Sequence, residues 1–368
     1  MMSYSLFGMC IAATAYLASA YESEGNEVLE RGPGRILFIG HPMIDIYCKA
    51  DQSVIDELGF RKGESNRITP DVFKKLGERV KIESQNAGGS SACTARSYSF
   101  LGGYSTFFGL CGDDKLCDDY AQCLSDYGVN LMLKRQPGQF TTQLYSLVTP
   151  DAERSMYFLG GASHGLNMDS LPGSIMDDYD FFGVNGYTFA TPQMVDFMHN
   201  MIEETLKRGK RVLTMLANAI CIRRNGKYLK PIAEKSAYIT GNLEEYLLLY
   251  ELEDREEVLR MFEQRTSGPN PQHTAVIITM GGDGAYIVYQ GRRHHVKAPK
   301  VEVVDTTGAG DFFCGGVFYG LFNGYTVRQA GIFGAAMAGE IINHFGTLVR
   351  DDFPAKIEAL KKQFAEEN

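Results

Sequence analysis

The densest group of residues that could do chemistry is DTTGAGDFFCGGVFYGLFNG at residues 305–324, which holds six glycines and no Lys or Arg. Gly308, Ala309 and Gly310 stand where a loop enters a predicted helix. Small residues there let backbone N–H groups approach an anion, which the helix N-terminus also attracts. Asp311 follows directly and could accept a hydroxyl proton during phosphoryl transfer. The alternative is that Asp311 only complements the helix dipole and that the glycines permit close packing.

A second small-residue loop, GGSSAC, opens another predicted helix with Gly88, Gly89 and Cys93. Asp45 stands five residues beyond Gly40, where the first predicted strand ends. A lone carboxylate beside a backbone loop could grip vicinal hydroxyls. A helix N-cap and an ordinary turn explain the same residues equally well.

Two further groups follow predicted strands. TMGGDG, with Thr279, Gly281 and Gly284, comes after a buried strand, at the sheet edge where open α/β sheets bind ligands; a turn into the next strand is the alternative. Asn242 and Glu245 open a helix. They could form a capping box, or Glu245 could hold a metal-bound water near phosphates.

Other catalytic motifs are missing or poorly placed. The chain has neither GxxxxGK[ST] nor GxGxxG, which excludes a P-loop enzyme and a dinucleotide-binding fingerprint. GASHG at residues 161–165 matches the GxSxG pattern of hydrolases. Residues 166–172 do not continue as a packed helix, however, so a nucleophile elbow is not expected.

The elements that must position these residues alternate between strands and helices from Arg35 onward. Apolar runs and helical spacing predict a mainly parallel sheet covered on both faces. The strands expected are 36–40, 104–110, 181–185, 212–216, 238–240 and 275–280, and the helices are 192–207, one from residue 242, 311–322, 327–342 and 353–364. Residues 140–160 predict a β-hairpin around Thr149-Pro150-Asp151, and residues 47–58 lack a helical pattern. These two pieces predict a small β-rich flap on one principal domain.

Composition agrees with a globular chain. Of the 368 residues 40 are glycine, a larger share than the usual ~7%. The chain has 45 acidic and 36 basic residues, which give a formal charge of −9. A surface that coats nucleic acid is therefore disfavoured. Eight cysteines form no CxxC pair and fit no zinc signature, which predicts reduced, mostly buried thiols.

The N-terminus differs from the rest. Residues 1–21 carry no charged side chain, and the apolar run 6–18 ends in Ala18-Ser19-Ala20, like a secretory signal without its basic start. A mis-assigned start or an unstructured tail fits as well. Residues 1–34 are therefore treated as an N-terminal extension, and no other segment approaches membrane length.

Together these motifs resemble the ribokinase-like (PfkB-type) family of carbohydrate and nucleoside kinases. VVDTTGAGDFFCGGVFYGL resembles its C-terminal signature, and GGSSACTARSYSFLGG followed by FFGLCGDD resembles its N-terminal one. VTPDAERSMYFLGGASHGL and VLTMLANAICIRR are most similar to the adenosine kinase branch. The resemblance implies a three-layer α/β/α ribokinase-like fold over residues 35–366, with a small β-rich lid from segments near 46–60 and 131–163.

The resemblance also implies a role for each matching residue. Asp311 would be the catalytic base, in an anion hole formed by Gly308, Ala309 and Gly310. Asp45, Gly88 and Gly89 would hold the acceptor's hydroxyls. Thr279, Gly281 and Gly284 would line the ATP site, with residues 338–346 beside its adenine. Asn242 and Glu245 would hold phosphate and Mg²⁺, Glu245 through a water. Asp305 and the Thr307 carbonyl would bind a possible K⁺.

Two departures bear on the acceptor. His41 and Cys93 stand where the adenosine kinase pattern usually has asparagines that contact it, and a thiol cannot replicate an amide's hydrogen bonds. The expected function is an ATP-dependent kinase acting on the primary hydroxyl of a ribonucleoside, with adenosine first. A ribose- or fructose-type sugar kinase and a non-catalytic ligand-binding relative are the alternatives.

The expected partners are small molecules, with no nucleic acid and no membrane, for a monomer or homodimer. An enzyme that uses ATP is expected in the cytoplasm, although the signal-like start could indicate a secretory or organellar route.

Overall fold

The large sheet forms the centre of the molecule. The computed structural model describes residues 34–60, 62, 65–151 and 154–367, so nearly all of the predicted N-terminal extension lies outside it. Nine strands run in the order β14-β13-β12-β11-β10-β9-β1-β5-β6, and all neighbours are parallel except β12 to β14, which form an antiparallel edge. These strands are β1 (Ile36–Ile39), β5 (Ser105–Gly112), β6 (Asn130–Gln136), β9 (Phe181–Asn185), β10 (Arg211–Met215), β11 (Tyr238–Asn242), β12 (Ala275–Thr279), β13 (Ala285–Tyr289) and β14 (Arg292–Val296).

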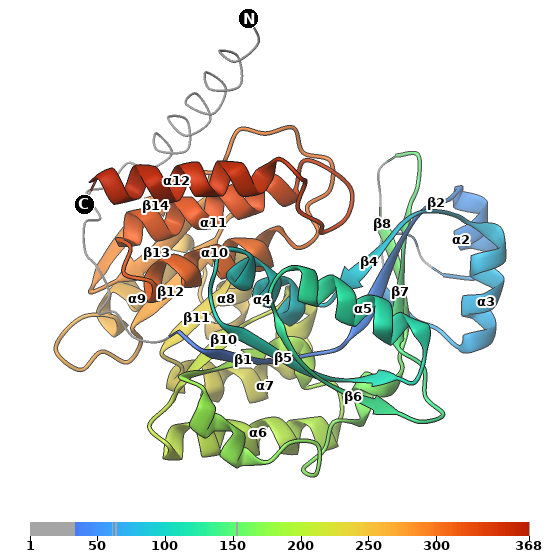
Figure 1. Ribbon diagram of the computed structural model, residues 1–368, viewed down its shortest axis with the longest axis horizontal. Coiled ribbons are helices and arrows are strands. Elements are labelled where there is room, and N and C mark those ends of the chain that lie inside the picture. Colours follow the sequence, from blue (N-terminus) through green and yellow to red (C-terminus); the bar gives the residue numbers. More distant parts are fainter. Residues whose placement is uncertain (1–33, 61, 63–64, 152–153, 368) are drawn as a thin grey trace, which may run out of the picture.

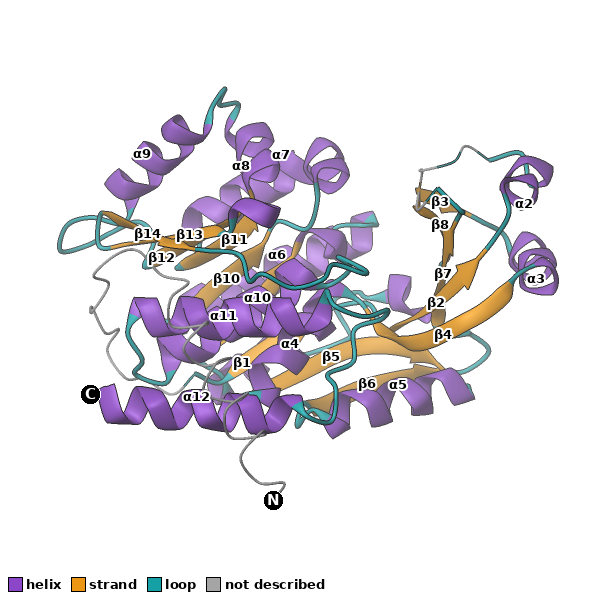
Figure 2. Ribbon diagram, turned by 90° about the horizontal axis from the view of Figure 1, so that it is seen from above, coloured by secondary structure: helices purple, strands orange, loops and turns teal. Residues whose placement is uncertain are grey.

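Helices cover both faces of this sheet (Figure 2). Successive strand residues point to opposite faces, so Ile36 and Phe38 belong to one apolar core while Leu37 and Ile39 belong to the other. The predicted three-layer α/β/α fold is thus confirmed. The first core packs against α4 (Ser90–Phe100), α5 (Lys115–Asp126), α10 (Ala309–Phe322), α11 (Val327–Ile341) and α12 (Phe353–Glu367), and the second against α6 (Pro192–Lys207), α7 (Ala219–Lys235), α8 (Leu243–Tyr250) and α9 (Arg255–Arg265).

A second, five-stranded sheet projects from one end of this body, with two short helices beside it (Figure 1). The predicted hairpin of residues 140–160 is confirmed as two antiparallel strands of this small sheet. Its order is β3-β8-β7-β2-β4. The elements are β2 (Met43–Lys49), β3 (Ser65–Arg67), β4 (Lys81–Gly88), β7 (Thr142–Val148), β8 (Arg154–Leu159), α2 (Gln52–Glu57) and α3 (Pro70–Arg79).

The predicted lid segments differ from the small sheet at two places. Residues 131–136, assigned to the lid, lie in β6 and pair with β5 in the large sheet. Conversely, β3 and β4 belong to the small sheet but lie outside the predicted segments 46–60 and 131–163. The first half of β4 is largely exposed, so no apolar alternation marked it as a strand.

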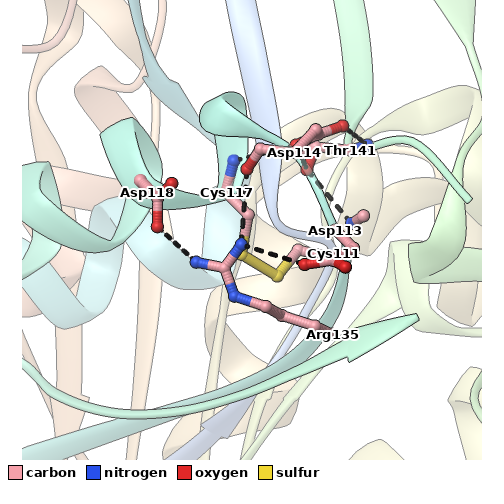
Figure 3. Close-up of a disulfide and its surroundings, with 8 residues drawn as sticks. Cys111, Asp113, Asp114, Cys117, Asp118, Arg135 and Thr141 are labelled. Atoms are coloured by element: carbon pink, nitrogen blue, oxygen red, sulfur yellow. Dashed lines mark hydrogen bonds and ion pairs between the residues drawn. A yellow bond between two sulfur atoms is a disulfide. The ribbon is translucent and has the colours of Figure 1, made fainter. Parts of the chain in front are cut away.

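The expectation that the cysteines are reduced is wrong for one pair, because Cys111 and Cys117 form a disulfide. The bond joins the end of β5 to the first turn of α5, as Figure 3 shows. Asp114 caps α5 and also accepts hydrogen bonds from the Thr141 backbone N–H (2.7 Å) and hydroxyl (2.6 Å). Thr141 directly precedes β7, so this corner lies at the junction between the two sheets. Among the described cysteines, four free thiols are buried and Cys123 is half-buried.

Across the described ranges, no helix combines the length and the apolar content that crossing a membrane requires.

Candidate active site

Helices α4 and α10 pack closely enough to bring their N-termini together. A Cβ on Gly315 would lie 2.5 Å from Ser97 Cβ, so only glycine allows this approach. The Ser97 hydroxyl donates to the Phe312 carbonyl at 2.6 Å and fixes the register of the two helices. The first residue of α4, Ser90, thereby lies against Asp311 near the start of α10.

Asp311 has the properties of a base at a half-buried position. Its Oδ1 accepts a hydrogen bond from the Ser90 hydroxyl at 2.5 Å. Burial raises the pKa of Asp311 to about 7, against the opposing effects of the Ser90 bond and the Arg96 charge. A carboxylate with a pKa near neutrality is suited to accept a proton at physiological pH.

The N-terminus of α10 offers the predicted anion site. Gly308 adopts a left-handed φ of 77° as N-cap, and the Ala309 N–H donates to the Thr306 carbonyl. A Cβ on Gly310 would meet no atom within 4 Å, so the space beside this turn is open. The N–H groups of Gly310 and Asp311 follow in the same turn, before the bond from the Phe312 N–H to the Gly308 carbonyl, and they can bind a negatively charged group here.

The predicted hydroxyl-binding residues also meet. Asp45 lies on β2, buried, and pairs in register with Asn86 of β4. A Cβ on Gly88 would lie 2.2 Å from Asp45 Oδ2, so any larger residue at this position would clash with the carboxylate. Gly89 has a φ of 92° and caps α4. The structure therefore brings Asp45, both glycines and Ser90 to one junction between the small sheet and α4.

The two departures from the adenosine kinase pattern lie beside this junction. His41 Nε2 donates to the Tyr187 carbonyl at 3.1 Å, and its ring stacks on His164 with centroids 5.2 Å apart. Burial lowers the pKa of both histidines, to about 4 for His164. The buried Cys93 thiol accepts a hydrogen bond from Arg96 and lies 3.9 Å from the position of a Cβ on Gly308.

Asn242 and Glu245 form the capping box at the start of α8, which confirms the structural interpretation of this pair. Both carboxylate oxygens of Glu245 accept hydrogen bonds from Asn242, from its backbone N–H (3.0 Å) and its amide (2.7 Å). Burial raises the pKa of Glu245 to about 7, and the charge of Asp311 contributes to the rise. Glu245 therefore also lies within electrostatic reach of the predicted base, so the cap does not exclude a functional role.

The predicted ATP-binding residues line one edge of the large sheet. A pocket of about 380 Å³ is lined by Thr279, Gly281, Asn242 and a residue that the motifs did not indicate, Arg255. Gly284 is required by the turn, since a Cβ there would lie 2.0 Å from the Val296 carbonyl oxygen. Arg255 begins α9 and adds a cation where a phosphate or a base could bind.

The remaining predicted positions surround α10. Asp305 Oδ1 accepts hydrogen bonds from the Thr307 N–H (3.0 Å) and hydroxyl (2.7 Å), which forms a tight turn before the helix. Residues 338–346 run from the end of α11 toward the small sheet, where a Cβ on Gly346 would lie 2.5 Å from Asn86 Nδ2. This segment therefore ends beside the hydroxyl-binding junction.

Sequence reasoning missed several contacts of this site. Ser90 directly follows the paired glycines and Asn185 ends a strand, which were the available signals, but their contact depends on the fold. Arg96, buried in α4, gave no signal at all. The hydrolase alternative is not supported, because Ser163 is buried in a short 3₁₀ turn and its hydroxyl is hydrogen-bonded to that of Thr142.

The family model described as "pfkB family carbohydrate kinase" matches residues 36–352. The chain belongs to this family. As a pfkB-family protein it is an ATP-dependent kinase, and membership implies the use of ATP and Mg²⁺. The predicted family resemblance is thus confirmed.

Similar proteins include nucleoside kinases. The chain is 27% identical to aminoimidazole riboside kinase of Salmonella typhimurium, over 71% of this chain and 82% of the relative. It is 21% identical to adenosine kinase 1 of Arabidopsis thaliana, over 85% and 95%. Among solved structures, the adenosine kinase of Sinorhizobium meliloti superposes with a TM-score of 0.78 at 26% identity, covering 89% of this chain and 99% of that one.

Proposed function

We propose that this pfkB-family kinase phosphorylates the primary hydroxyl of a ribonucleoside, with adenosine as the first candidate. The observation that carries the proposal is the hydrogen bond between Ser90 and Asp311. Ser90 directly follows Gly88 and Gly89, and Gly88 adjoins the Asp45 carboxylate. Only the Ser90 side chain therefore separates the predicted hydroxyl-binding junction from the predicted base. An acceptor held at the junction would present its primary hydroxyl to Asp311.

Each residue then has a defined task. Asp45 accepts hydrogen bonds from the vicinal hydroxyls, while Gly88 and Gly89 let the sugar approach the backbone. Asp311 takes the proton of the primary hydroxyl. In the turn formed by Gly308, Ala309 and Gly310, the Ala309 N–H is bonded to Thr306, and the N–H groups that follow it stabilise the charge on the transferred phosphoryl group. The small sheet, which carries Asp45, would act as a lid that excludes water.

The rings beside the junction favour a nucleoside over a free sugar. His41 stacks on His164, and Tyr187, whose carbonyl accepts a hydrogen bond from His41, keeps 42% of its surface exposed. A heteroaromatic base can stack on an aromatic face, whereas a pentose has no planar ring to do so. The relatives named for adenosine and for aminoimidazole riboside agree with this preference. A free pentose is the alternative acceptor.

The donor side fits ATP and Mg²⁺. Within the described part of the chain, no cluster of three or more His, Cys, Asp or Glu side chains could cage a metal ion. Mg²⁺ keeps several waters and binds through few carboxylates plus substrate phosphates, where it neutralises developing charge. Glu245 would orient such a water, with Asn242 holding its carboxylate. Thr279 and Gly281 line the nucleotide pocket, and Gly284 shapes the turn beside it. A K⁺ at Asp305 and Thr307 remains a prediction, which activity in KCl against NaCl tests.

The test measures ATP consumption over a panel of ribonucleosides and free pentoses, with Asp311→Asn as the matched control. Turnover with a ribonucleoside, lost in Asp311→Asn, is the expected result. Turnover only with free pentoses would show that the acceptor is a sugar and not a nucleoside. No turnover with any acceptor would contradict the proposal, and full activity of Asp311→Asn would contradict the assigned base.

A further inference from the structure

A hydrogen-bonded chain begins at the Tyr187 backbone and ends on Asp311. Its other members are Asn185 and Ser90, and these two and Asp311 come from three different elements. The Tyr187 backbone N–H donates to Asn185 Oδ1 at 3.0 Å, and Asn185 Nδ2 donates to Ser90 Oγ at 2.8 Å. The Ser90 hydroxyl in turn donates to Asp311 Oδ1 at 2.5 Å. Asn185 ends β9, Ser90 begins α4, and Asp311 lies in the first turn of α10.

The donor and the acceptor of every hydrogen bond in this chain follow from the Tyr187 backbone N–H, where the chain begins. A backbone N–H can only donate, so Asn185 turns its Oδ1 toward Tyr187 and its Nδ2 toward Ser90. The Nδ2 group can only donate, so the Ser90 oxygen accepts. Ser90 has a single hydroxyl hydrogen, which is then left for Asp311. The carboxylate therefore receives a donor on Oδ1.

The chain is also held rigidly. Asn185 is 1% exposed, and its carbonyl accepts a further hydrogen bond from the Thr188 hydroxyl at 2.6 Å. Ser97, about two turns further along α4, donates to the carbonyl of Phe312, the residue directly after Asp311, and locks α4 to α10. Asp311 consequently cannot turn Oδ1 away from Ser90 without breaking a charge-assisted hydrogen bond, which is stronger than a neutral one.

We propose that Ser90 and Asn185 are positioning residues that keep Asp311 ionised and reserve its Oδ2 for the acceptor's hydroxyl. The proposal rests on the proposed role of Asp311 as base. In the step it serves, the hydroxyl proton moves to Oδ2 and the acceptor oxygen bonds to the terminal phosphorus of ATP. The bond from that phosphorus to the bridging oxygen breaks, and ADP leaves with the electron pair.

Other titratable groups lie within electrostatic reach of Asp311, and of these the Arg96 charge lowers the pKa of Asp311. They are Arg96 and Cys93 on α4, Glu245 on α8, Cys314 on α10 itself and Tyr187 in the turn after β9. Asn185→Leu also removes the acceptor of the Tyr187 backbone N–H, whereas Ser90→Ala changes none of these five groups. A difference in pH profile between the wild type and Ser90→Ala therefore reports on the hydrogen-bonded chain.

The experiment measures kcat and kcat/KM from pH 5 to 9 for Ser90→Ala, Asn185→Leu and the double variant. Ser90→Ala is expected to lower kcat about tenfold to hundredfold, the usual range for a hydrogen bond to a charged group. The acid limb of its profile moves to higher pH, because the bond favours the ionised carboxylate. Asn185→Leu should shift the acid limb less than Ser90→Ala does. In the double variant it should cause no further loss of kcat and no further shift of the limb, because Asn185 acts through Ser90.

Two control variants separate this role from a purely structural one. Ser97→Ala also removes a hydroxyl that joins α4 to α10, and it should lower stability without moving the acid limb. Ser90→Thr keeps the hydroxyl and should retain the wild-type limb, which keeps the proposal testable if Ser90→Ala does not fold.

Additive losses from Ser90→Ala and Asn185→Leu, or an unmoved acid limb in Ser90→Ala, would overturn the positioning role while Asp311→Asn remains inactive. A fully active Asp311→Asn would instead overturn the base assignment itself.

Discussion

Arg96 and Cys93 are hydrogen-bonded to each other, with Nη2 of the guanidinium 3.2 Å from Sγ of the thiol. Arg96 is completely buried, and the same nitrogen donates to the Thr347 hydroxyl at 2.8 Å. Burial raises the pKa of the Cys93 thiol to about 12, so it stays neutral beside this cation. Cys93 is thus occupied as an acceptor and can offer a bound acceptor molecule only its weak S–H donor.

Cys93→Asn is therefore expected to improve nucleoside binding. The new Oδ1 would accept from Arg96, which leaves Nδ2 free to donate to a sugar hydroxyl. One neutral hydrogen bond is worth about 1 kcal/mol, so KM for the nucleoside should fall roughly fivefold with kcat unchanged. Steady-state kinetics check this, with Cys93→Ala as a control that gains no bond. An unchanged or higher KM in Cys93→Asn would show that Cys93 does not face the acceptor.

Gly310→Ala tests the anion site without disturbing the fold. A Cβ at this position meets no atom within 4 Å, and alanine favours the helix, so stability should be kept or slightly raised. The methyl group would project into the space where the phosphoryl group is expected to bind. We expect kcat/KM to fall about 100-fold or more, the scale on which losing an anion-hole contact acts.

The matched control for this change is Gly226→Ala in α7, where a Cβ would make only ordinary contacts at 3.8 Å. It should keep full activity. If Gly310→Ala is as active as Gly226→Ala, phosphoryl transfer does not take place at the start of α10.

Much of this architecture could be predicted because its signals are local. The buried strands of the large sheet are short apolar runs, and the glycines before Asp311 mark the start of α10 directly. The small sheet was predicted only in part, since β4 begins with exposed polar residues that carry no strand periodicity.

The missed contacts of the site are not local. Ser90 and Asp311 are 221 residues apart, and Asn185 lies 95 residues from Ser90, so only the packing of three elements brings them together. The disulfide was missed for a similar reason, because a spacing of six residues between Cys111 and Cys117 matches no signature.

Asp311→Asn should abolish activity and stabilise the protein at alkaline pH. The pKa of Asp311 in the folded state, about 7, exceeds its ordinary value of 3.8. Folding therefore favours the protonated form, and the free energy of unfolding falls as pH rises from 3.8 to 7 and stays reduced above that. Asparagine removes this cost, which is on the order of 4 kcal/mol at most. The same ionisation predicts that wild-type kcat/KM falls as pH drops below about 7.

Urea unfolding of both proteins at pH 4 and pH 8 checks the stability prediction. The variant should unfold at higher urea at pH 8, and the difference should shrink at pH 4, where the carboxyl group is protonated in the folded protein. An equal difference in unfolding urea concentration between the two proteins at pH 4 and pH 8 would show that Asp311 does not cause the pH dependence of stability.

Breaking the Cys111–Cys117 disulfide is expected to destabilise the corner where β5, α5 and the strand after Thr141 meet (Figure 3). The bond closes a short loop, for which chain entropy predicts a loss of about 2 kcal/mol in the free energy of unfolding. Asp114 lies inside this loop and holds Thr141, so looser packing there should also raise KM for the acceptor by moving the small sheet. Urea unfolding and kinetics with and without dithiothreitol measure both effects. Cys111→Ser with Cys117→Ser is the control, which should match the reduced wild type and be insensitive to the reductant. A wild type whose unfolding midpoint does not change on reduction would contradict the prediction.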